Sequence, residues 1–170
     1  IIQVNKNHYS LHIGDAGLNA RIVRDYEEDK DRGYLTYAKY FIEEVQKSEP
    51  FKIRIKADGK IYHKEGYMLA VANAQKYGTG VKLNYRSKVD DGVFEICILK
   101  DVKMSTFIKA GLTAFDIHLD ERESIEIISC KEARIEFNQP IPFQLDGEYL
   151  GEVSEFTTKI IEAAISVIVS

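Results

Sequence analysis

The stretch Phe51-Lys52-Ile53-Arg54-Ile55-Lys56-Ala57-Asp58-Gly59-Lys60-Ile61-Tyr62 decides the fold class. Its first half alternates apolar and basic side chains, and this period of two is typical of a half-buried β-strand. Asp58-Gly59 follows directly and is the strongest short signal for a tight hairpin, so Ile61-Tyr62 is predicted to begin the return strand. The domain is therefore expected to be built from antiparallel strands.

Further strands are predicted along the rest of the chain. Residues 67–72 are continuously apolar, which predicts a strand covered on both faces. A second Asp-Gly pair, Asp146-Gly147, separates the apolar segments 143–145 and 149–150 and predicts a second hairpin. Alternating or β-rich composition predicts the other strands, at residues 81–85, 93–99, 124–130, 133–137 and 165–169.

Two segments depart from this pattern. Apolar residues recur at helical spacing over residues 34–45, and Pro50 lies just beyond them. The same spacing recurs over residues 107–115, where Ser105 is placed as an N-cap. Many short strands with closely spaced turns predict a mainly β fold, a β-sandwich or barrel with two or so flanking helices. No linker or repeat interrupts the pattern, so residues 1–170 are expected to form a single domain.

Composition narrows the function classes. Hydrophobic residues make up 45% and charged residues 29% of the chain, as in ordinary globular domains, and the net charge of −4 gives no reason to expect nucleic-acid binding. Two cysteines, Cys97 and Cys130, imply no disulfide framework and are predicted to be buried core residues of a cytoplasmic protein. The chain starts at Ile1 without a signal peptide, and we expect it to be part of a longer protein.

Two acidic turns could carry chemistry. Asp146-Gly147-Glu148 is either a turn whose Asp-Gly pair supplies positive φ angles, or a rigid hairpin whose two carboxylates act as a general base on a substrate hydroxyl. Asp90-Asp91-Gly92 is either a solvated turn or an oxygen-ligand site for a hard cation. The residues alone leave both alternatives open.

A loop after the buried strand is a candidate for contact with a substrate. Residues 73–80 combine an amide, a basic residue and two glycines, which either permit a tight loop or let the backbone approach a ligand. The candidate residues are Asn73, Tyr77, Gly78 and Gly80. The loop lacks the Gly-Lys-Ser/Thr sequence of a nucleotide-binding P-loop.

Several short motifs follow one another along the chain: Gly17-Leu18-Asn19-Ala20, Gly33-Tyr34-Leu35-Thr36-Tyr37, Val71-Ala72-Asn73 with Tyr77-Gly78-Thr79-Gly80, Asp90-Asp91-Gly92, and Gln144-Leu145-Asp146-Gly147-Glu148. In this order they resemble the C-terminal domain of the diacylglycerol kinase and sphingosine kinase superfamily, and the bacterial soluble lipid kinases most closely. The resemblance covers nearly the whole chain. It implies a β-sandwich that follows an upstream α/β domain for ATP, with the active site in the cleft between the two.

The resemblance also implies an activity and roles for residues. The activity is transfer of the ATP γ-phosphate to a lipid hydroxyl, such as that of diacylglycerol, with Mg²⁺ at the phosphates and a base at the nucleophile. Asp146 and Glu148 would supply the base region as a pair, with the choice between them open. The side chain of Asp91 and the backbone carbonyls of Lys88 and Val93 would match a structural magnesium site. ATP would be bound mainly upstream, so the isolated domain is expected to fold but to be inactive.

The resemblance also implies partners, and other functions stay open beside it. The implied partners are a lipid substrate and ATP, and both peripheral membrane contact and homo-oligomers are compatible with it. Asn19 stands where an acidic residue is common in the family, which leaves room for an altered lipid specificity. Two other functions stay open: a non-catalytic β-sandwich that binds an apolar ligand or a protein partner, and a nicotinamide-nucleotide kinase domain.

Overall fold

The computed structural model describes residues 1–28, 34–74, 87–101 and 124–165, and it contains the predicted hairpin. Strands β4 (Phe51–Ala57) and β5 (Lys60–Gly66) pair antiparallel along their whole length. In β4 every second residue, beginning with Phe51, is buried, as the alternation predicted. Asp58 and Gly59 have φ angles of 45° and 80°, the positive pair that a tight two-residue turn requires.

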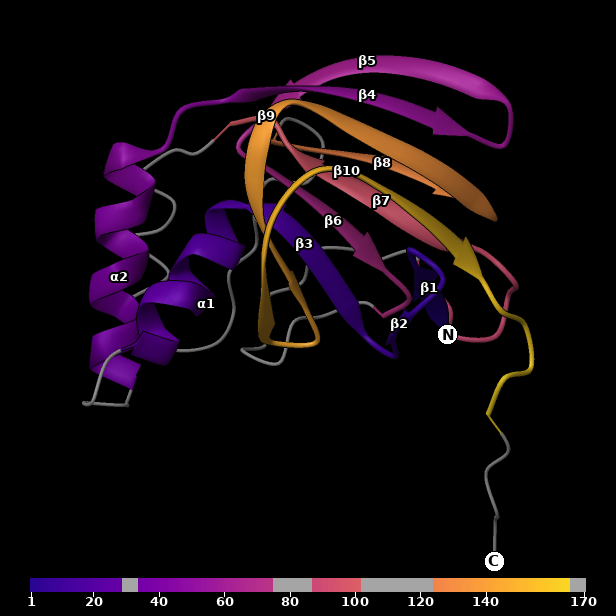
Figure 1. The fold of residues 1–170 in the computed structure, drawn as a ribbon, viewed down its shortest axis with the longest axis horizontal. Helices are drawn as coiled ribbons and strands as arrows, with labels where there is room; N and C mark the ends of the chain where they lie inside the picture. The colour runs from indigo at the N-terminus through magenta and orange to yellow at the C-terminus, as the bar shows by residue number, and fades with distance from the viewer. Residues whose placement is uncertain (29–33, 75–86, 102–123, 166–170) are drawn as a thin grey trace, which may run out of the picture.

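The described chain is mainly β, with helices on one side of the strands (Figure 1). The other strands are β1 (Ile2–Val4), β2 (His8–Ser10), β3 (Ile13–Gly17), β6 (Met68–Ala72), β7 (Phe94–Leu99), β8 (Ile125–Cys130), β9 (Glu132–Leu145) and β10 (Glu148–Ile160). The helices are α1 (Leu18–Glu28) and α2 (Tyr34–Lys47). All strand pairs are antiparallel, in agreement with a sandwich connected by hairpins.

The long strands β9 and β10 join two layers. The first half of β9 pairs with β4, and its last residues pair with β3. β10 follows β9 with register shifts near Gly151, whose φ is 93°. One layer therefore runs β5-β4-β9-β10-β1-β2 and the other runs β8-β7-β6-β3 into the far half of β9. The predicted β-sandwich with flanking helices is confirmed.

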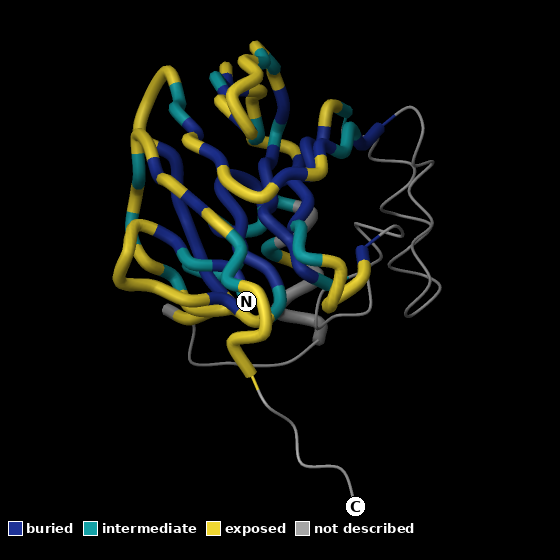
Figure 2. Tube along the Cα trace, turned by 90° about the vertical axis from the view of Figure 1, so that its right-hand side faces the viewer, coloured by how far each residue is buried: buried dark blue, intermediate teal, exposed yellow. Residues whose placement is uncertain are grey.

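Apolar side chains form a core on each face of the second layer. Strand β6 is buried on both faces, as its continuous apolar sequence predicted, and its alternate residues enter different clusters. Leu69 and Val71 point into the core between the layers, while Met68 and Ala70 face the side where Leu18 of α1 packs. Figure 2 shows the buried trace in the middle of the molecule and exposed residues on the outer strands. At about 25 cal/mol per Å², burial of these side chains is the main stabilising contribution.

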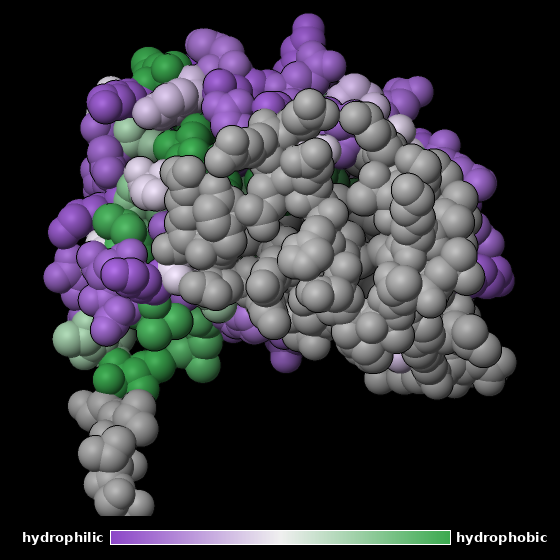
Figure 3. Space-filling view, turned by 180° about the vertical axis from the view of Figure 1, so that it is seen from behind, coloured by the Kyte–Doolittle hydropathy of each residue, from purple (hydrophilic) through white to green (hydrophobic). Residues whose placement is uncertain are grey.

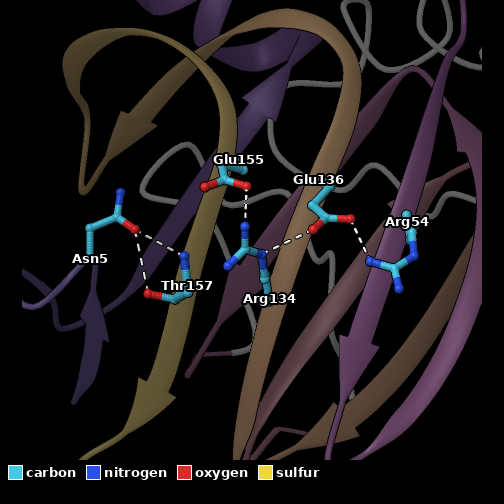
Figure 4. A network of polar contacts seen from close by, with 6 residues as sticks. All are labelled: Asn5, Arg54, Arg134, Glu136, Glu155 and Thr157. Carbon is cyan, nitrogen blue, oxygen red and sulfur yellow. Dashed lines mark hydrogen bonds and ion pairs between the residues drawn. The ribbon is translucent and has the colours of Figure 1, made fainter.

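The outer face of the first layer is covered by alternating charges (Figure 4). Arg54 of β4 pairs with Glu136 of β9 at 2.5 Å, and Glu136 also accepts a hydrogen bond from Arg134 at 3.0 Å. Arg134 reaches Glu155 of β10 at 2.5 Å. Because acids and bases alternate across the strands, this face carries no strong field of one sign.

The helices and strands of the structure agree with the predicted elements in part. Helix α2 is confirmed, and Val45 is buried as its spacing predicted. Of the strand predicted at residues 165–169, only residue 165 is described, and it is not in a strand; residues 166–169 lie outside the described residues. The helix predicted at residues 107–115 and the strand predicted at residues 81–85 lie outside the described residues. Strands β1, β2 and β3 and helix α1 were not predicted.

Both cysteines are free and buried, as expected. Burial raises the pKa of Cys130 to about 12, and it raises that of Cys97 further. Neither thiol is activated as a nucleophile. A separate observation concerns membranes: in the part of the chain that is described, no helix has the length and apolar character needed to cross one.

Candidate functional site

The predicted acidic hairpin connects β9 to β10. Leu145 pairs with Glu148, so the loop between the strands is the two-residue Asp146-Gly147 turn. Asp146 has a φ of 49° and Gly147 a φ of 93°, which confirms the turn interpretation. Glu148 is the first residue of β10 and its side chain is exposed.

The carboxylate of Asp146 is occupied by hydrogen bonds from a distant segment. It accepts them from Ser10 Oγ at 2.7 Å and from the backbone N–H groups of Leu11, His12 and Ile13 at 2.8, 3.2 and 3.0 Å. The backbone N–H of Asp146 donates in turn to the carbonyl of Ile13 at 2.9 Å. Asp146 therefore fastens the hairpin tip to the start of β3.

A buried polar pair lies beside the same tip. Asp15 of β3 and Gln144 of β9 stand opposite each other in the sheet and are 0% and 1% exposed. Gln144 Nε2 donates a hydrogen bond to Asp15 Oδ2, and Asn19 of α1 donates to the same oxygen at 2.7 Å. Gln144 Oε1 accepts the backbone N–H of Gly147 at 2.8 Å. The turn is thus held at Gly147 by the buried side chain of Gln144 and at Asp146 by the segment that precedes β3.

Asn73 and the second acidic turn line one groove of about 620 Å³. Asn73 is 5% exposed, and its backbone N–H donates to the carbonyl of His12 at 3.0 Å. Its side-chain Oδ1 is buried and has no hydrogen-bond partner among the described residues. Leu11, whose N–H binds Asp146, lines the groove together with Asp91. The segment at residues 11–12 therefore connects the acidic hairpin to the groove.

The donors around the second acidic turn fit a hard cation. Asp91 Oδ1 accepts the N–H of Val93 at 3.2 Å, which shapes the turn. Within the described ranges no three His, Cys, Asp or Glu side chains are grouped to hold a metal ion. A site here would rely on one carboxylate, backbone carbonyls and water, which is the kind of set that Mg²⁺ accepts. The predicted ligands, the side chain of Asp91 and the backbone carbonyls of Lys88 and Val93, all belong to this segment, and Asp91 is an exposed residue.

Apolar side chains surround the groove. Leu11, Val89 and Ile165 are 59, 73 and 55% exposed, and all three line it. Figure 3 shows hydrophobic side chains gathered beside the C-terminal end of the described chain. Lys131 and Glu162, which pair at 2.9 Å, add charge to the rim. A groove with an apolar rim and a buried amide oxygen has the general character of a ligand site.

Helix α1 packs against β3, β9 and β10. It carries Arg24, whose positive charge lies close enough to Tyr149 of β10 to interact with it. The pKa of Arg24 is raised above its ordinary value chiefly by its hydrogen bond to Asp25, at 2.8 Å, with smaller effects of Tyr149 and Glu44. Tyr149 directly follows Glu148, so α1 and the start of β10 share one polar environment.

The structure brings some predicted residues together and leaves others untested. Asp146, Asn73 and Asp91 are connected through residues 10–13, and Glu148 belongs to the same hairpin as Asp146. Three predicted loop residues, Tyr77, Gly78 and Gly80, lie outside the described residues. Two partners of the tip were missed. The only sequence signals for them are a charged residue, Asp15, within a run of small and apolar residues, and the glutamine that precedes Leu145.

Fold and site together define an antiparallel β-sandwich domain with an acidic hairpin beside a groove that has an apolar rim. More specifically, residues 13–169 match the family described as the YegS C-terminal NAD kinase beta sandwich-like domain, and the chain belongs to this family. The predicted resemblance to the C-terminal domain of lipid kinases is therefore confirmed.

Curated relatives and solved structures agree with this assignment. The chain is 28% identical over 154 residues to the "Diacylglycerol kinase" of Bacillus subtilis, covering 88% of this chain and 50% of the relative. It is 25% identical over 171 residues to the "Probable lipid kinase YegS-like" of Pectobacterium atrosepticum, covering 97% and 54%. The chain thus spans about half the length of these relatives.

Two solved structures from Bacillus anthracis share the fold. A diacylglycerol kinase from this organism has a TM-score of 0.61 at 17% identity, covering 95% of this chain and 49% of that chain. A candidate diacylglycerol kinase has a TM-score of 0.65 at 21% identity, covering 95% and 52%.

Proposed function

We propose that this chain is the C-terminal domain of a lipid kinase that transfers the γ-phosphate of ATP to a lipid hydroxyl, with diacylglycerol as the first candidate substrate. The names of the relatives support the lipid, and the span of about half their length supports a division of labour with a further domain. That further domain would bind ATP. This chain would contribute the hydroxyl side of the active site.

Within the acidic hairpin, Glu148 would be the general base and Asp146 would position it. The observation that carries this assignment is the difference between the two carboxylates. Asp146 accepts four hydrogen bonds from residues 10–13, whereas Glu148 is exposed at the start of β10. A base must have a lone pair directed at the substrate hydroxyl, within about 3 Å. An exposed Glu148 would be able to turn toward a hydroxyl without breaking the hydrogen bonds of the tip.

Asp91, with the carbonyls of Lys88 and Val93, would hold Mg²⁺ in the proposed enzyme. Bound there, the ion would add positive charge beside the groove and fix the acidic turn. Asn73 would offer its free Oδ1 to a hydroxyl or amide of the substrate, because a buried acceptor without a partner costs stability until it is bound. Apolar residues at the rim, such as Leu11 and Val89, would accommodate the lipid chain at a bilayer surface.

The experiment uses the full-length protein and measures ATP-dependent phosphorylation of diacylglycerol in mixed micelles. Glu148→Gln is expected to lower kcat by about 10²–10⁴-fold, the usual contribution of a general base. Glu152→Gln, an exposed carboxylate on the same strand, is the matched control and should leave kcat unchanged. Full turnover by Glu148→Gln would remove this residue from the mechanism.

A substrate panel separates the lipid kinase from the alternatives. The family description includes NAD kinase-like domains, so the panel contains NAD beside diacylglycerol and a long-chain base. Phosphorylation of NAD alone would overturn the lipid assignment. Binding of lipid vesicles without phosphorylation of any substrate would instead favour a non-catalytic binding domain.

A further inference from the structure

The buried pair Asp15–Gln144 lies on the face of the sheet that α1 covers. Asp15 and Gln144 are directly opposite each other on β3 and β9, and both are almost completely buried. The carboxylate receives hydrogen bonds from Gln144 and from Asn19, so a strand, a second strand and a helix meet at one oxygen. Burying a carboxylate has a desolvation cost that an apolar residue at the same position would not have. The charge therefore calls for a reason other than packing.

The groups that bind the two ends of the Gln144 amide allow it only one orientation. Asp15 Oδ2 accepts hydrogen bonds from both Gln144 and Asn19, so this end of the Gln144 amide must be its Nε2 amino group. The backbone N–H of Gly147 is a donor only, so it must face Oε1. The acceptor at one end and the donor at the other thus fix the side chain in a single rotational state. The consequence is a rigid bridge from the interior of the domain to the hairpin tip.

This bridge acts on the residue next to Glu148. Gln144 holds the peptide between Asp146 and Gly147, and Gly147 leads directly into Glu148. Asp146 holds the other side of the turn through Ser10 and the following backbone N–H groups. With both sides fixed, the positive φ angles of the turn and the starting direction of β10 have little freedom. A catalytic group displaced by about 1 Å can lose about 10²-fold in rate.

We propose that Asp15 and Gln144 are positioning residues that set the orientation of Glu148 through the backbone of Gly147. The inference rests on the proposed role of Glu148 as base. Neither residue touches substrate in this scheme. Their effect is on kcat rather than on the affinity for ATP or lipid. Asn19 supports the pair by supplying the second donor to Asp15.

The test is carried out in the full-length protein with the micelle assay. Gln144→Met keeps the shape of the side chain and removes both hydrogen bonds. It is expected to lower kcat by about 10–100-fold while both KM values stay within about twofold. Ile141→Val removes one methylene from the buried core of the same strand and serves as a control of comparable stability loss. Equal kcat in the two variants would overturn the inference.

A second variant and a double mutant keep the result interpretable. Asp15→Asn nearly preserves shape and puts an amide in place of the carboxyl group that orients Gln144, so kcat should fall even where the unfolding midpoint is retained. If Gln144 acts through Glu148, the variant Gln144→Met/Glu148→Gln should be no slower than Glu148→Gln alone, because the two losses are not additive. Additive losses would contradict the positioning role.

The failures of the two proposals are distinguishable. Full turnover by Glu148→Gln removes the base and with it the present inference. Loss of turnover by Glu148→Gln, combined with control-like kcat in Gln144→Met and Asp15→Asn, leaves the proposed function intact and removes only the positioning role.

Discussion

The two Asp-Gly hairpins of this domain have the same turn but different surroundings. Asp58-Gly59 has φ angles of 45° and 80°, and Asp146-Gly147 has 49° and 93°. In each, the aspartate N–H donates to a carbonyl of a neighbouring segment, that of Glu132 or that of Ile13. In each, the carboxylate accepts backbone N–H groups from the same segment. The aspartate is therefore part of the turn architecture in both places.

What differs is the flanking sequence. Ala57 precedes the first turn and Lys60 follows it, whereas Gln144-Leu145 precedes the second and Glu148 follows it. Only the second tip is tied to a buried carboxylate, that of Asp15, by a side chain that reaches the turn glycine. If the aspartate does the same work in both hairpins, the chemistry specific to the second one lies in its flanks. This is the physical reason for preferring Glu148 to Asp146 as the base.

The largest expected effect comes from removing the two aspartates. Asp146→Ala should lower the free energy of unfolding by about 2–3 kcal/mol, because four donors lose a charged acceptor. Asp58→Ala should cost about 1–2 kcal/mol, since its carboxylate serves only the N–H groups of Lys131 and Glu132. Denaturant titration measures both. An Asp146 variant that keeps wild-type stability would contradict the structural role assigned to this side chain.

The turn glycines, Gly59 and Gly147, allow a second comparison of the two hairpins, with a smaller expected effect on stability. A Cβ at Gly59 or at Gly147 would meet no atom within 4 Å, so alanine at either position brings only the strain of a positive φ. That strain is about 1–2 kcal/mol at each site. Gly59→Ala and Gly147→Ala should therefore lose similar stability. In the proposed full-length kinase only Gly147→Ala should lose kcat, because it would displace Glu148. Equal kcat in the two variants would show that the tip tolerates movement.

Local patterns in the sequence predicted most of the strands. In β4 the alternating sequence matches a strand buried on one face, and in β6 the continuous apolar sequence matches a strand buried on both faces. Strand β3 was missed because its sequence, Ile13-Gly14-Asp15-Ala16-Gly17, consists mainly of small residues that look like a loop. It is a strand because Gly14 and Ala16 allow β9 to pack closely, and a Cβ at Gly14 would overlap Leu145. Helix α1 follows it directly and was also missed, although Leu18 and Ile22 are spaced for a helix.

The hairpin that carries the candidate site was predictable from the sequence, but its connections to other segments were not. Asp146 and Glu148 are close in sequence, so their hairpin could be predicted from the Asp-Gly pair alone. The hydrogen bonds that separate their roles come from Ser10 and the residues after it, which are more than 130 positions away. Only the folded sheet brings these segments together. The same holds for Asp15 and Gln144, whose pairing depends on the register of β3 against β9.

The smallest expected effect concerns the charged ladder that links the first hairpin to β9 and β10. The pKa of Glu136 is lowered from its ordinary value of 4.5, first by its hydrogen bond from Arg54 and further by Arg134. A carboxyl whose pKa is lower in the folded state adds stability that is complete above its unfolded pKa and is lost as the pH falls through the folded value. Glu136→Gln should therefore flatten the decline of stability below about pH 4.5, by a small amount because the group is partly exposed and screened by salt. Denaturant titrations of both proteins at several acidic pH values and two salt concentrations measure the difference.

Because the ladder lies on β4 and the outer half of β9, the variant should leave kcat at neutral pH unchanged. A loss of kcat would mean that the two halves of β9 are coupled, and the contrast between the two hairpins would no longer separate structure from catalysis.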